Sequence, residues 1–247
     1  MKGTTPSGIR TEREAAAWVR GMFARVAPRY DLANHLLSFN IDRHWRAHTV
    51  RRLRGILANP AARVLDVCCG TGDLVLALER ARGAPVLGSD FCHPMLIAAR
   101  RKFESAHARS PLFESDALAL PVSSGSLDLI TVAFGFRNLA NYQSGLQEMR
   151  RVLQPGGTAA ILEFSQPSNP AFAALYNFYS RRILPLIGGA ISGDPGAYRY
   201  LPESVRKFPT AAELAAEMRR AGFSEVSYEL LTGGIVALHL GKRAAKT

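Results

Sequence analysis

The sequence has few cysteines, few acidic residues for its number of basic ones, and no long apolar run. Three cysteines occur, two of them adjacent (Cys68 and Cys69), and no secretory signal precedes them. This pattern argues against a disulfide framework and for a reducing, cytoplasmic compartment. The longest uncharged apolar stretch, Ile183 to Gly193, is far shorter than the roughly 20 residues of a spanning helix. We therefore expect a chain that does not cross a membrane.

The shortage of acidic residues is greatest near the N-terminus. The chain has 31 Lys and Arg against 20 Asp and Glu, a formal net charge of +11, and residues 1–60 hold eleven basic against four acidic residues. Such a bias favours an anionic partner, either nucleic acid or an acidic bilayer surface on the cytoplasmic side. Arginines that only keep helical faces soluble would give the same count, so charge alone leaves the partner open.

Short apolar runs alternate with longer amphipathic segments, a pattern typical of βαβ units. The expected strands are 63–67, 85–89, 112–113, 127–134, 158–164, 226–231 and 235–241, and the expected helices are 73–81, 94–105, 142–153 and 211–221. Apolar runs at Val64 and Leu129 suit buried parallel strands, and the short loop 232–234 makes the last two strands antiparallel neighbours. The pattern predicts an α/β fold with a mostly parallel seven-stranded sheet, a C-terminal antiparallel hairpin and helices on both faces.

We expect residues 1–247 to form one domain, since α/β folds of this length commonly share one core. Its parts are an N-terminal helical region (12–57), a cofactor-binding core (60–165), an insert (169–209) and a C-terminal helix with the hairpin (210–242). Ligands of open α/β sheets bind beyond the carboxyl ends of the strands. The N-terminal region and the insert lie outside the alternation and are therefore expected to shape a substrate pocket.

A glycine turn after the first strand is the most informative stretch. The run from Val64 to Leu74 leads an apolar strand through Gly70-Thr71-Gly72 into a helix. A dinucleotide site would continue with a third glycine, but Val75 stands there, and Asp73 would repel a pyrophosphate. S-adenosylmethionine carries a sulfonium and an ammonium instead of phosphate, so acidic groups at the turn become favourable.

Three carboxylates follow three successive strands. Asp66 precedes the turn, Asp90 follows the second strand where a carboxylate can accept both ribose hydroxyls, and Asp116 with Ala117 follows the third, within reach of adenine. Asp90 could instead be the N-cap of the next helix. These positions predict S-adenosylmethionine as the cofactor. No metal is expected, because the cysteines and His93 lack the spacing of a zinc site.

Four further segments are distinctive. They are Tyr30-Asp31-x-x-Asn34-x-x-x-Ser38-Phe39 with Trp45-Arg46, Phe134-Gly135-Phe136-Arg137-Asn138, Gly193-Asp194 with Tyr198-Arg199-Tyr200-Leu201, and the tail from Leu231 to His239. Together they resemble the UbiE/MenG-type quinone C-methyltransferase family, from about residue 20 to residue 242. Two departures are Asn40, where the family usually has glycine, and Phe136, where leucine is usual.

The resemblance implies a Rossmann-like class I S-adenosylmethionine-dependent methyltransferase fold and cofactor contacts by Thr71, Asp90, Asp116 and Ala117. Gly70, Gly72, Asp66 and Phe91 complete the expected cofactor site, with Ala133 at a position where the family often has a serine. It further implies C-methylation of a demethylmenaquinol in menaquinone biosynthesis, the activity of a demethylmenaquinone methyltransferase. A benzoquinol of ubiquinone biosynthesis is the related possibility.

Ring-carbon methylation needs a quinol whose hydroxyl loses its proton, and a phenolic pKa near 10 calls for a base or a stabilising cation. We predict Arg137 as this cation, the competing role being to brace its loop. Tyr200, Arg199 and Asp194 of the insert are weaker candidates for substrate binding or proton removal. Aromatic and aliphatic residues of the insert, from Leu175 to Ile187, could line a groove for an isoprenoid tail or belong to an ordinary core helix.

Other functions remain open at this level. A nucleic-acid methyltransferase fits the charge, but Phe134-Gly-Phe-Arg stands where an Asn/Asp-Pro-Pro-aromatic segment would be expected, and no cysteine follows a proline. A non-catalytic cofactor-binding subunit and a methyltransferase for another hydrophobic phenol are further alternatives. The sequence leaves open the choice between naphthoquinol and benzoquinol, the tail length, the catalytic base, the oligomeric state and the extent of membrane contact.

Overall fold

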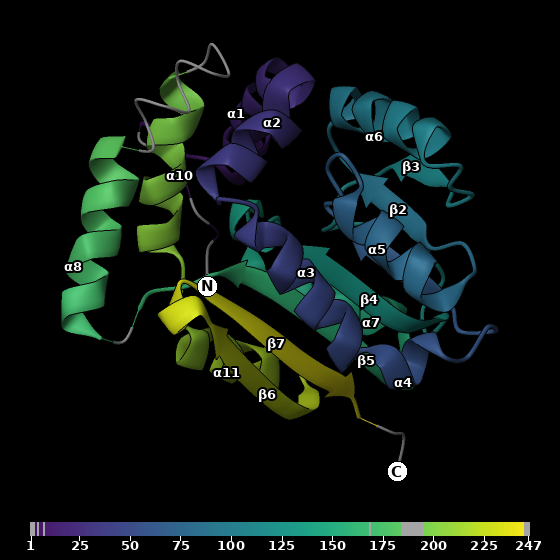
Figure 1. The fold of residues 1–247 in the computed structure, drawn as a ribbon. Coiled ribbons are helices and arrows are strands. Elements are labelled where there is room, and N and C mark those ends of the chain that lie inside the picture. Colours follow the sequence, from purple (N-terminus) through teal and green to yellow (C-terminus); the bar gives the residue numbers. More distant parts are fainter. Residues whose placement is uncertain (1–2, 4, 7, 168, 184–194, 245–247) are drawn as a thin grey trace.

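A seven-stranded sheet runs through the centre of the protein in a computed structural model, which describes residues 3, 5–6, 8–167, 169–183 and 195–244 (Figure 1). The strands are β1 (Val64–Val67), β2 (Leu87–Asp90), β3 (Leu112–Glu114), β4 (Leu127–Ala133), β5 (Leu153–Phe164), β6 (Phe223–Leu231) and β7 (Val236–Arg243). Their order is β3-β2-β1-β4-β5-β7-β6, and β7 is antiparallel to both of its neighbours. The predicted parallel sheet with a C-terminal antiparallel hairpin is confirmed.

The apolar runs that predicted central strands are buried as expected. All four residues of β1 are buried, and Leu129 and Ile130 of β4 have no exposed surface. Strand β5 begins five residues earlier than predicted, because Leu153 pairs with Leu127 across an irregularity in the ladder. The preceding helix ends at Val152, one residue before its predicted end.

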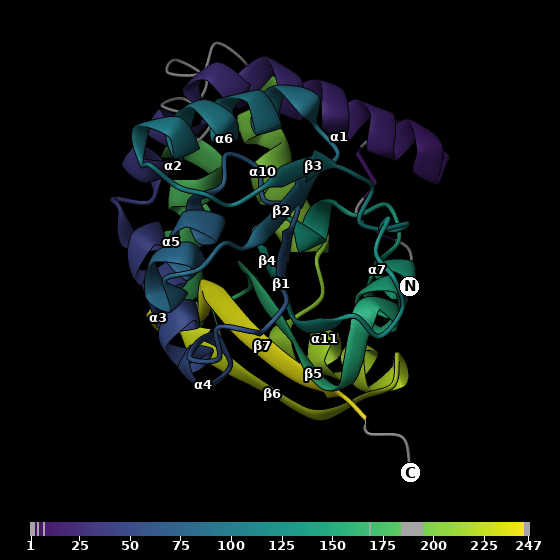
Figure 2. The same ribbon diagram turned by 90° about the vertical axis from the view of Figure 1, so that its right-hand side faces the viewer.

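Helices cover both faces of the sheet (Figure 2). The helices are α1 (Glu12–Val26), α2 (Tyr30–Leu37), α3 (Ile41–Arg52), α4 (Arg54–Leu57), α5 (Asp73–Arg82), α6 (His93–Ser105), α7 (Tyr142–Val152), α8 (Pro170–Phe178), α10 (Pro195–Lys207) and α11 (Ala211–Arg220). Short helical turns are η1 (Ala27–Arg29), η2 (Phe136–Asn138), η3 (Tyr179–Ile183) and η4 (Thr232–Gly234). Helices α3, α4, α5 and α6 share one apolar core with Val64 and Leu129, whereas α7 and α11 share a second core with Leu65 and Ile130.

A third apolar cluster joins the two pieces that lie outside the strand and helix alternation. It brings Val19 and Met22 of α1 against Met95 of α6 and Tyr200 of α10. The rings of Trp18 and Tyr200 lie 5.0 Å apart. We call α1, α2, α8 and α10 the helical cover, because they lie beyond the carboxyl ends of the parallel strands (Figure 1). Within the described residues, no helix is long and apolar enough to cross a membrane.

Candidate active site

The turn after β1 has the left-handed backbone that its glycines predict. Cys68, Gly70 and Gly72 have φ angles of 52°, 55° and 83°, and Gly72 is the N-cap of α5. A Cβ on Gly72 would lie 2.4 Å from Cε1 of Phe103, so backbone and packing both require glycine there. A Cβ on Gly70 would instead project into open space. The turn therefore leaves room for a ligand to approach its backbone.

A cavity of about 400 Å³ lies between the carboxyl ends of the strands and the helical cover. Most of the residues predicted to bind the cofactor line it, namely Asp66, Gly70, Thr71, Asp90, Phe91, Asp116, Ala117 and Ala133. Gly72 is not among the lining residues and acts through the shape of the turn. Arg137 and Tyr200 also line the cavity, whereas Asp194 lies outside the described residues.

Two of the carboxylates are buried at the sheet end of the cavity. The hydroxyl of Thr131 donates to Oδ1 of Asp66 at 2.5 Å, and the amides of Gly70 and Cys92 donate to Oδ2 and Oδ1 of Asp90 at 2.8 and 2.9 Å. Burial raises the pKa of Asp66 to about 7 and that of Asp90 to about 6, while these hydrogen bonds oppose the rise. A cationic ligand would restore the ionised form, so the geometry suits a sulfonium compound.

Asp90 is not the N-cap of the next helix, which was the competing interpretation. Helix α6 begins at His93, and its N-cap is Cys92. The side chain of Asp90 instead links the end of β2 to the glycine turn through the amide of Gly70. It remains at the cavity wall, where further lone pairs can accept hydroxyl groups.

Two polar groups at the cavity wall have no hydrogen-bond partner within the described residues, and a bound adenosyl group could supply one. The hydroxyl of Ser115 and Nδ2 of Asn138 are buried and have no hydrogen-bond partner within the described residues. Asp116 accepts the amide of Leu118 at 2.9 Å and presents an exposed carboxylate. These groups fit the expected cofactor and substrate. The sequence reasoning missed Ser115 and Asn138, although each adjoins a predicted site residue.

Arg137 follows β4 in the turn η2, and its side chain is buried. Its Nη1 donates to Oε1 of Glu163 at 2.9 Å and to the carbonyl of Phe134 at 2.5 Å, and Nε donates to the hydroxyl of Ser204 at 3.3 Å. These bonds do brace the loop. Within the part of the chain that the structure describes, Nη2 has no acceptor, and the residue faces the cavity. Arg137 can thus brace the loop and still offer a donor to a ligand.

Three tyrosines surround this arginine. Burial raises the pKa of Tyr30, and it raises the pKa of Tyr176 and Tyr200 to about 12. The positive charge of Arg137 opposes the rise in all three pKa values. The hydroxyl of Tyr200 donates to Oδ1 of Asn138 at 3.2 Å. These tyrosines are therefore neutral hydrogen-bond donors at physiological pH, and a pKa of about 12 makes Tyr200 a poor candidate for a base.

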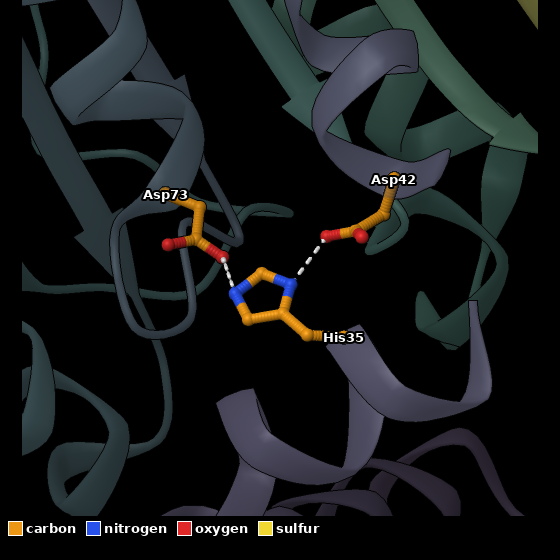
Figure 3. A group of neighbouring side chains, drawn as sticks. All are labelled: His35, Asp42 and Asp73. Atoms are coloured by element: carbon orange, nitrogen blue, oxygen red, sulfur yellow. Dashed lines mark hydrogen bonds and ion pairs between the residues drawn. The ribbon is translucent and has the colours of Figure 1, made fainter. Parts of the chain in front are cut away.

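An ion-pair network at the cavity rim ties the N-terminal helices to the start of α5 (Figure 3). Nδ1 of His35 lies 2.9 Å from Oδ2 of Asp42, and its Nε2 lies 4.0 Å from Oδ2 of Asp73. These three side chains could supply three metal ligands. Arg46, however, pairs with Asp42 and Asp73 at 2.5 and 3.4 Å, and Lys102 pairs with Asp73 at 2.7 Å. The carboxylates are already matched with cations, and the cluster acts as a structural link.

Thr71 belongs to the same network. Its hydroxyl donates to Oδ1 of Asp31 at 2.6 Å and accepts from Nζ of Lys102 at 3.2 Å. Lys102 also pairs with Oδ2 of Asp31 at 2.6 Å. The predicted cofactor contact of Thr71 is consequently coupled to the position of α2.

The insert contributes aromatic side chains to the opposite wall. Tyr176 and Tyr179 line the cavity, as does Phe172, which precedes the predicted stretch. Phe178 is exposed and does not line it. Residues 184–187, also expected in the groove, lie outside the described residues. The described part of the insert thus gives the cavity an apolar wall facing the acidic one.

The cysteines show no sign of nucleophilic chemistry. Burial and the nearby carboxylates Asp90 and Asp66 raise the pKa of both Cys68 and Cys69 well above that of a free thiol. A neutral thiol is a weak nucleophile. This environment argues against methylation of cytosine C5 through a cysteine adduct.

This chain is similar to known proteins in sequence and in fold. Residues 10–243 match the model of the ubiE/COQ5 methyltransferase family. A demethylmenaquinone methyltransferase of Thermus thermophilus is 52% identical over 223 residues, which cover 90% of this chain and 100% of the relative. A ubiquinone/menaquinone biosynthesis C-methyltransferase UbiE of Syntrophotalea carbinolica is 49% identical, over 91% of this chain and 94% of the relative.

Solved structures agree on the fold. A SAM-dependent methyltransferase from Aquifex aeolicus superposes with a TM-score of 0.58 at 19% identity, covering 80% of this chain and 89% of its own. A SAM-dependent methyltransferase from Thermotoga maritima, a possible histamine N-methyltransferase, gives a TM-score of 0.64 at 18% identity, covering 90% and 98%. At such identities the likeness concerns the fold alone, and it confirms the predicted methyltransferase fold.

Proposed function

Since the chain belongs to the ubiE/COQ5 methyltransferase family, and is thus an S-adenosylmethionine-dependent methyltransferase, we propose that it methylates a ring carbon of a polyprenyl quinol, first of all demethylmenaquinol. The name of the Thermus relative favours the naphthoquinol. The name UbiE on the second relative favours a benzoquinol as an alternative or additional substrate. The product would then be a menaquinol or a ubiquinol precursor.

The acidic wall would hold the cofactor, which supplies an activated methyl group when bound. Asp90 would accept the ribose hydroxyls, and Asp116 with the amide of Ala117 would bind the adenine edge. In the described residues this amide has no acceptor of its own. Asp66 would favour the positive charge, and Gly70 would allow close approach. Ala133 offers no side-chain donor, so any contact there would involve its backbone.

The opposite wall would bind the quinol. Its hydroxyl would lie near the guanidinium of Arg137 and near Nδ2 of Asn138, which is buried without a hydrogen-bond partner in the described residues. Tyr176 and Phe172 would pack against the ring or the first isoprene unit. Asp194, as well as Tyr200, remains a candidate for the proton transfer, although the high pKa of Tyr200 favours a binding role.

One observation carries the substrate proposal. Burial raises the pKa of the three phenols that the protein itself places around Arg137, namely Tyr30, Tyr176 and Tyr200, and the charge of Arg137 opposes that rise in each of them. A substrate phenol in the same cavity would experience the same field. Loss of its proton raises electron density on the ring carbon that attacks the methyl group. A quinol can respond in this way, whereas the oxidised quinone has no hydroxyl to ionise.

The decisive experiment offers the purified chain a panel of acceptors with methyl-labelled S-adenosylmethionine. The panel contains a reduced short-chain naphthoquinol, a reduced benzoquinol, a simple phenol and RNA, each with its oxidised or unreactive counterpart. We expect label on a ring carbon of the quinols and none on the quinones. Label in RNA or only in the simple phenol would contradict the proposal, and cofactor binding without any transfer would indicate a non-catalytic subunit.

The basic N-terminal region further supports the proposal that the protein rests on an anionic membrane surface, where polyprenyl quinols reside. In residues 1–60 the basic side chains outnumber the acidic ones by seven. Binding to anionic vesicles should therefore weaken as salt is added, because salt screens exposed charges.

A further inference from the structure

Several large apolar side chains at the turn between α2 and α3, and one at the end of α8, are exposed to solvent. Leu32 and Leu36 lie one helical turn apart on α2 and are 57% and 51% exposed, and Phe39 beyond them is 74% exposed. Ile41 at the start of α3 is 38% exposed, and Phe178 at the end of α8 is 59% exposed. We call these five residues the apolar rim.

Contacts of their sequence neighbours bring the parts of the apolar rim near one another. The ring of Phe39 lies 6.3 Å from that of Tyr179, the residue after Phe178. The hydroxyl of Tyr179 donates to the carbonyl of Leu37 at 2.7 Å, which ties the end of α8 to α2. A grouped apolar surface of this kind marks a site of interaction with a protein or a membrane.

The backbone holds Phe39 outward at a conformational cost. Phe39 and Asn40 have φ angles of 52° and 59°, in the left-handed region that a bulky residue seldom adopts. The amide of Asn40 donates to the carbonyl of His35 at 2.8 Å and closes the turn. Because this conformation gains no burial for the Phe39 ring in the free protein, a binding partner would explain it.

The apolar rim lies at the mouth of the cavity. Phe39 and Ile41 both line the cavity and are both exposed, so they stand where it meets the surface. Tyr179, whose ring adjoins that of Phe39, also lines the cavity. Leu32 and Leu36 extend the apolar surface outward and do not line the cavity. A long isoprenoid chain could therefore reach the quinol site past Phe39 and Ile41.

Positive charge accompanies the apolar rim. Arg43 follows Ile41 by two residues, Arg182 follows Phe178 by four, and both side chains are exposed. The two acidic residues of this stretch, Asp31 and Asp42, are already paired with Lys102 and Arg46. Exposed apolar side chains with exposed arginines near them in the sequence match the acyl region and the anionic headgroups of a bilayer.

From these observations we propose that the apolar rim, Leu32, Leu36, Phe39, Ile41 and Phe178, inserts into the surface of an anionic lipid bilayer and places the cavity mouth on the membrane. This proposal rests on the proposed quinol methylation, since it assigns the route by which a membrane-dissolved substrate would enter. Arg43 and Arg182 would contact the headgroups.

The test measures partition of the full chain onto phosphatidylcholine vesicles that contain about one third phosphatidylglycerol. Leu36→Ser should weaken partition about 5-fold, and Leu32→Ser with Leu36→Ser about 20-fold, because each removes apolar area from the inserted surface. Arg43→Gln should weaken partition about 5-fold on these vesicles and leave binding to pure phosphatidylcholine unchanged. Ile97→Ser is the matched control, since Ile97 is an exposed helical residue of α6, 43% exposed, on the other side of α2 from α8 (Figure 1).

Activity separates this proposal from the proposed function. The double leucine variant should methylate a short-chain, water-soluble quinol at the wild-type rate and lose activity only on a long-chain quinol in vesicles. A wild-type chain that fails on both quinols would refute the proposed function. Wild-type partition by the double variant, or an equal loss with Ile97→Ser, would refute the apolar rim as the membrane contact. A wild-type dimer that the double variant dissociates would assign this surface to a second copy and likewise overturn the proposal.

Discussion

The two walls of the cavity are built in different ways. The acidic wall comes from segments that each follow their own strand, the turn after β1, Asp90 after β2 and Asp116 after β3. The apolar wall comes from helices that are distant in sequence. The hydrogen bond from Tyr179 to Leu37 spans 142 residues, and the one from Trp45 to Thr232 spans 187. The cofactor wall is thus locally encoded, whereas the substrate wall exists only after the chain has folded.

The walls also differ in how they treat charge. On the acidic wall, burial raises the pKa of Asp66 and Asp90, so a bound positive charge would favour the ionised form of both carboxylates. On the apolar wall, burial raises the pKa of the tyrosines, and Arg137 opposes that rise. One wall therefore favours a cationic methyl donor, and on the other the charge of Arg137 partly offsets the cost that burial imposes on an ionised phenol. This division suits a reaction between a sulfonium and a phenolate-activated carbon.

The largest expected effect concerns Arg137, whose replacement should impair the reaction of the acceptor and leave cofactor binding intact. The change Arg137→Gln should lower turnover by about 10² or more while leaving S-adenosylmethionine affinity within about 2-fold, because it removes a cation that acts on the acceptor. Single-turnover kinetics and calorimetry measure the two quantities.

The control for this variant addresses the ion pair with Glu163. Arg137→Gln alone leaves the buried Glu163 carboxylate without its partner, which lies 2.9 Å away, and can destabilise the fold. The double variant Arg137→Gln with Glu163→Gln restores neutrality. If Arg137 only braces the loop, turnover should recover in the double variant, and such recovery would remove it from the chemistry.

The difference between the locally encoded cofactor wall and the substrate wall also determines which site residues could be predicted from the sequence. Gly70, Gly72, Asp66 and Asp90 were predicted because their spacing follows directly from a strand, a turn and a helix. Sequence periodicity likewise located all seven strands, with boundary errors such as the early start of β5 at Leu153.

The substrate wall was predicted less well. Phe172 carries no pattern that marks it as a cavity residue, because its position depends on packing between distant helices. On the cofactor wall Ser115 was missed as well, because a single serine after β3 carries no distinctive signal. The pairing of Arg137 with Glu163 was missed because the two residues lie 26 positions apart, with α7 between them, and meet only when β4 and β5 pair in the sheet. The resemblance to a family identified Arg137 as a candidate, but its contacts required the structure.

A pH dependence provides the next sharpest test of the acidic wall. Burial raises the pKa of Asp66 from 3.8 to about 7, so the free protein takes up a proton as pH falls through 7. Since the cofactor cation favours the ionised form, its affinity should fall about tenfold between pH 8 and pH 6. S-adenosylhomocysteine lacks the sulfonium charge and should show a smaller fall. Calorimetry across this range, with both ligands, measures the difference.

The stability of the ligand-free protein should change in the opposite direction. A raised carboxyl pKa means that the folded state binds more protons than the unfolded state between pH 4 and 7, so this group's contribution to stability decreases as pH rises toward 7. Asp66→Asn still accepts the hydroxyl of Thr131 but cannot titrate. It should bind the cofactor weakly, with a flatter pH dependence, and melt at a higher temperature at pH 8. An unchanged pH profile in this variant would assign the titration to another group.

The smallest effect concerns Asn40, the N-cap of α3 in the turn beside the substrate wall, where the local backbone conformation determines which residue fits. Its φ of 59° costs an alanine about 1 kcal/mol, whereas asparagine and glycine tolerate it. We expect Asn40→Ala to lower the free energy of unfolding by about 1 kcal/mol and Asn40→Gly to change it by less than about 0.5 kcal/mol, because glycine gains backbone freedom in the unfolded state as well. Denaturant unfolding of both variants measures these differences. Equal destabilisation by alanine and glycine would mean that the asparagine side chain, and not its backbone conformation, stabilises the turn that presents Phe39.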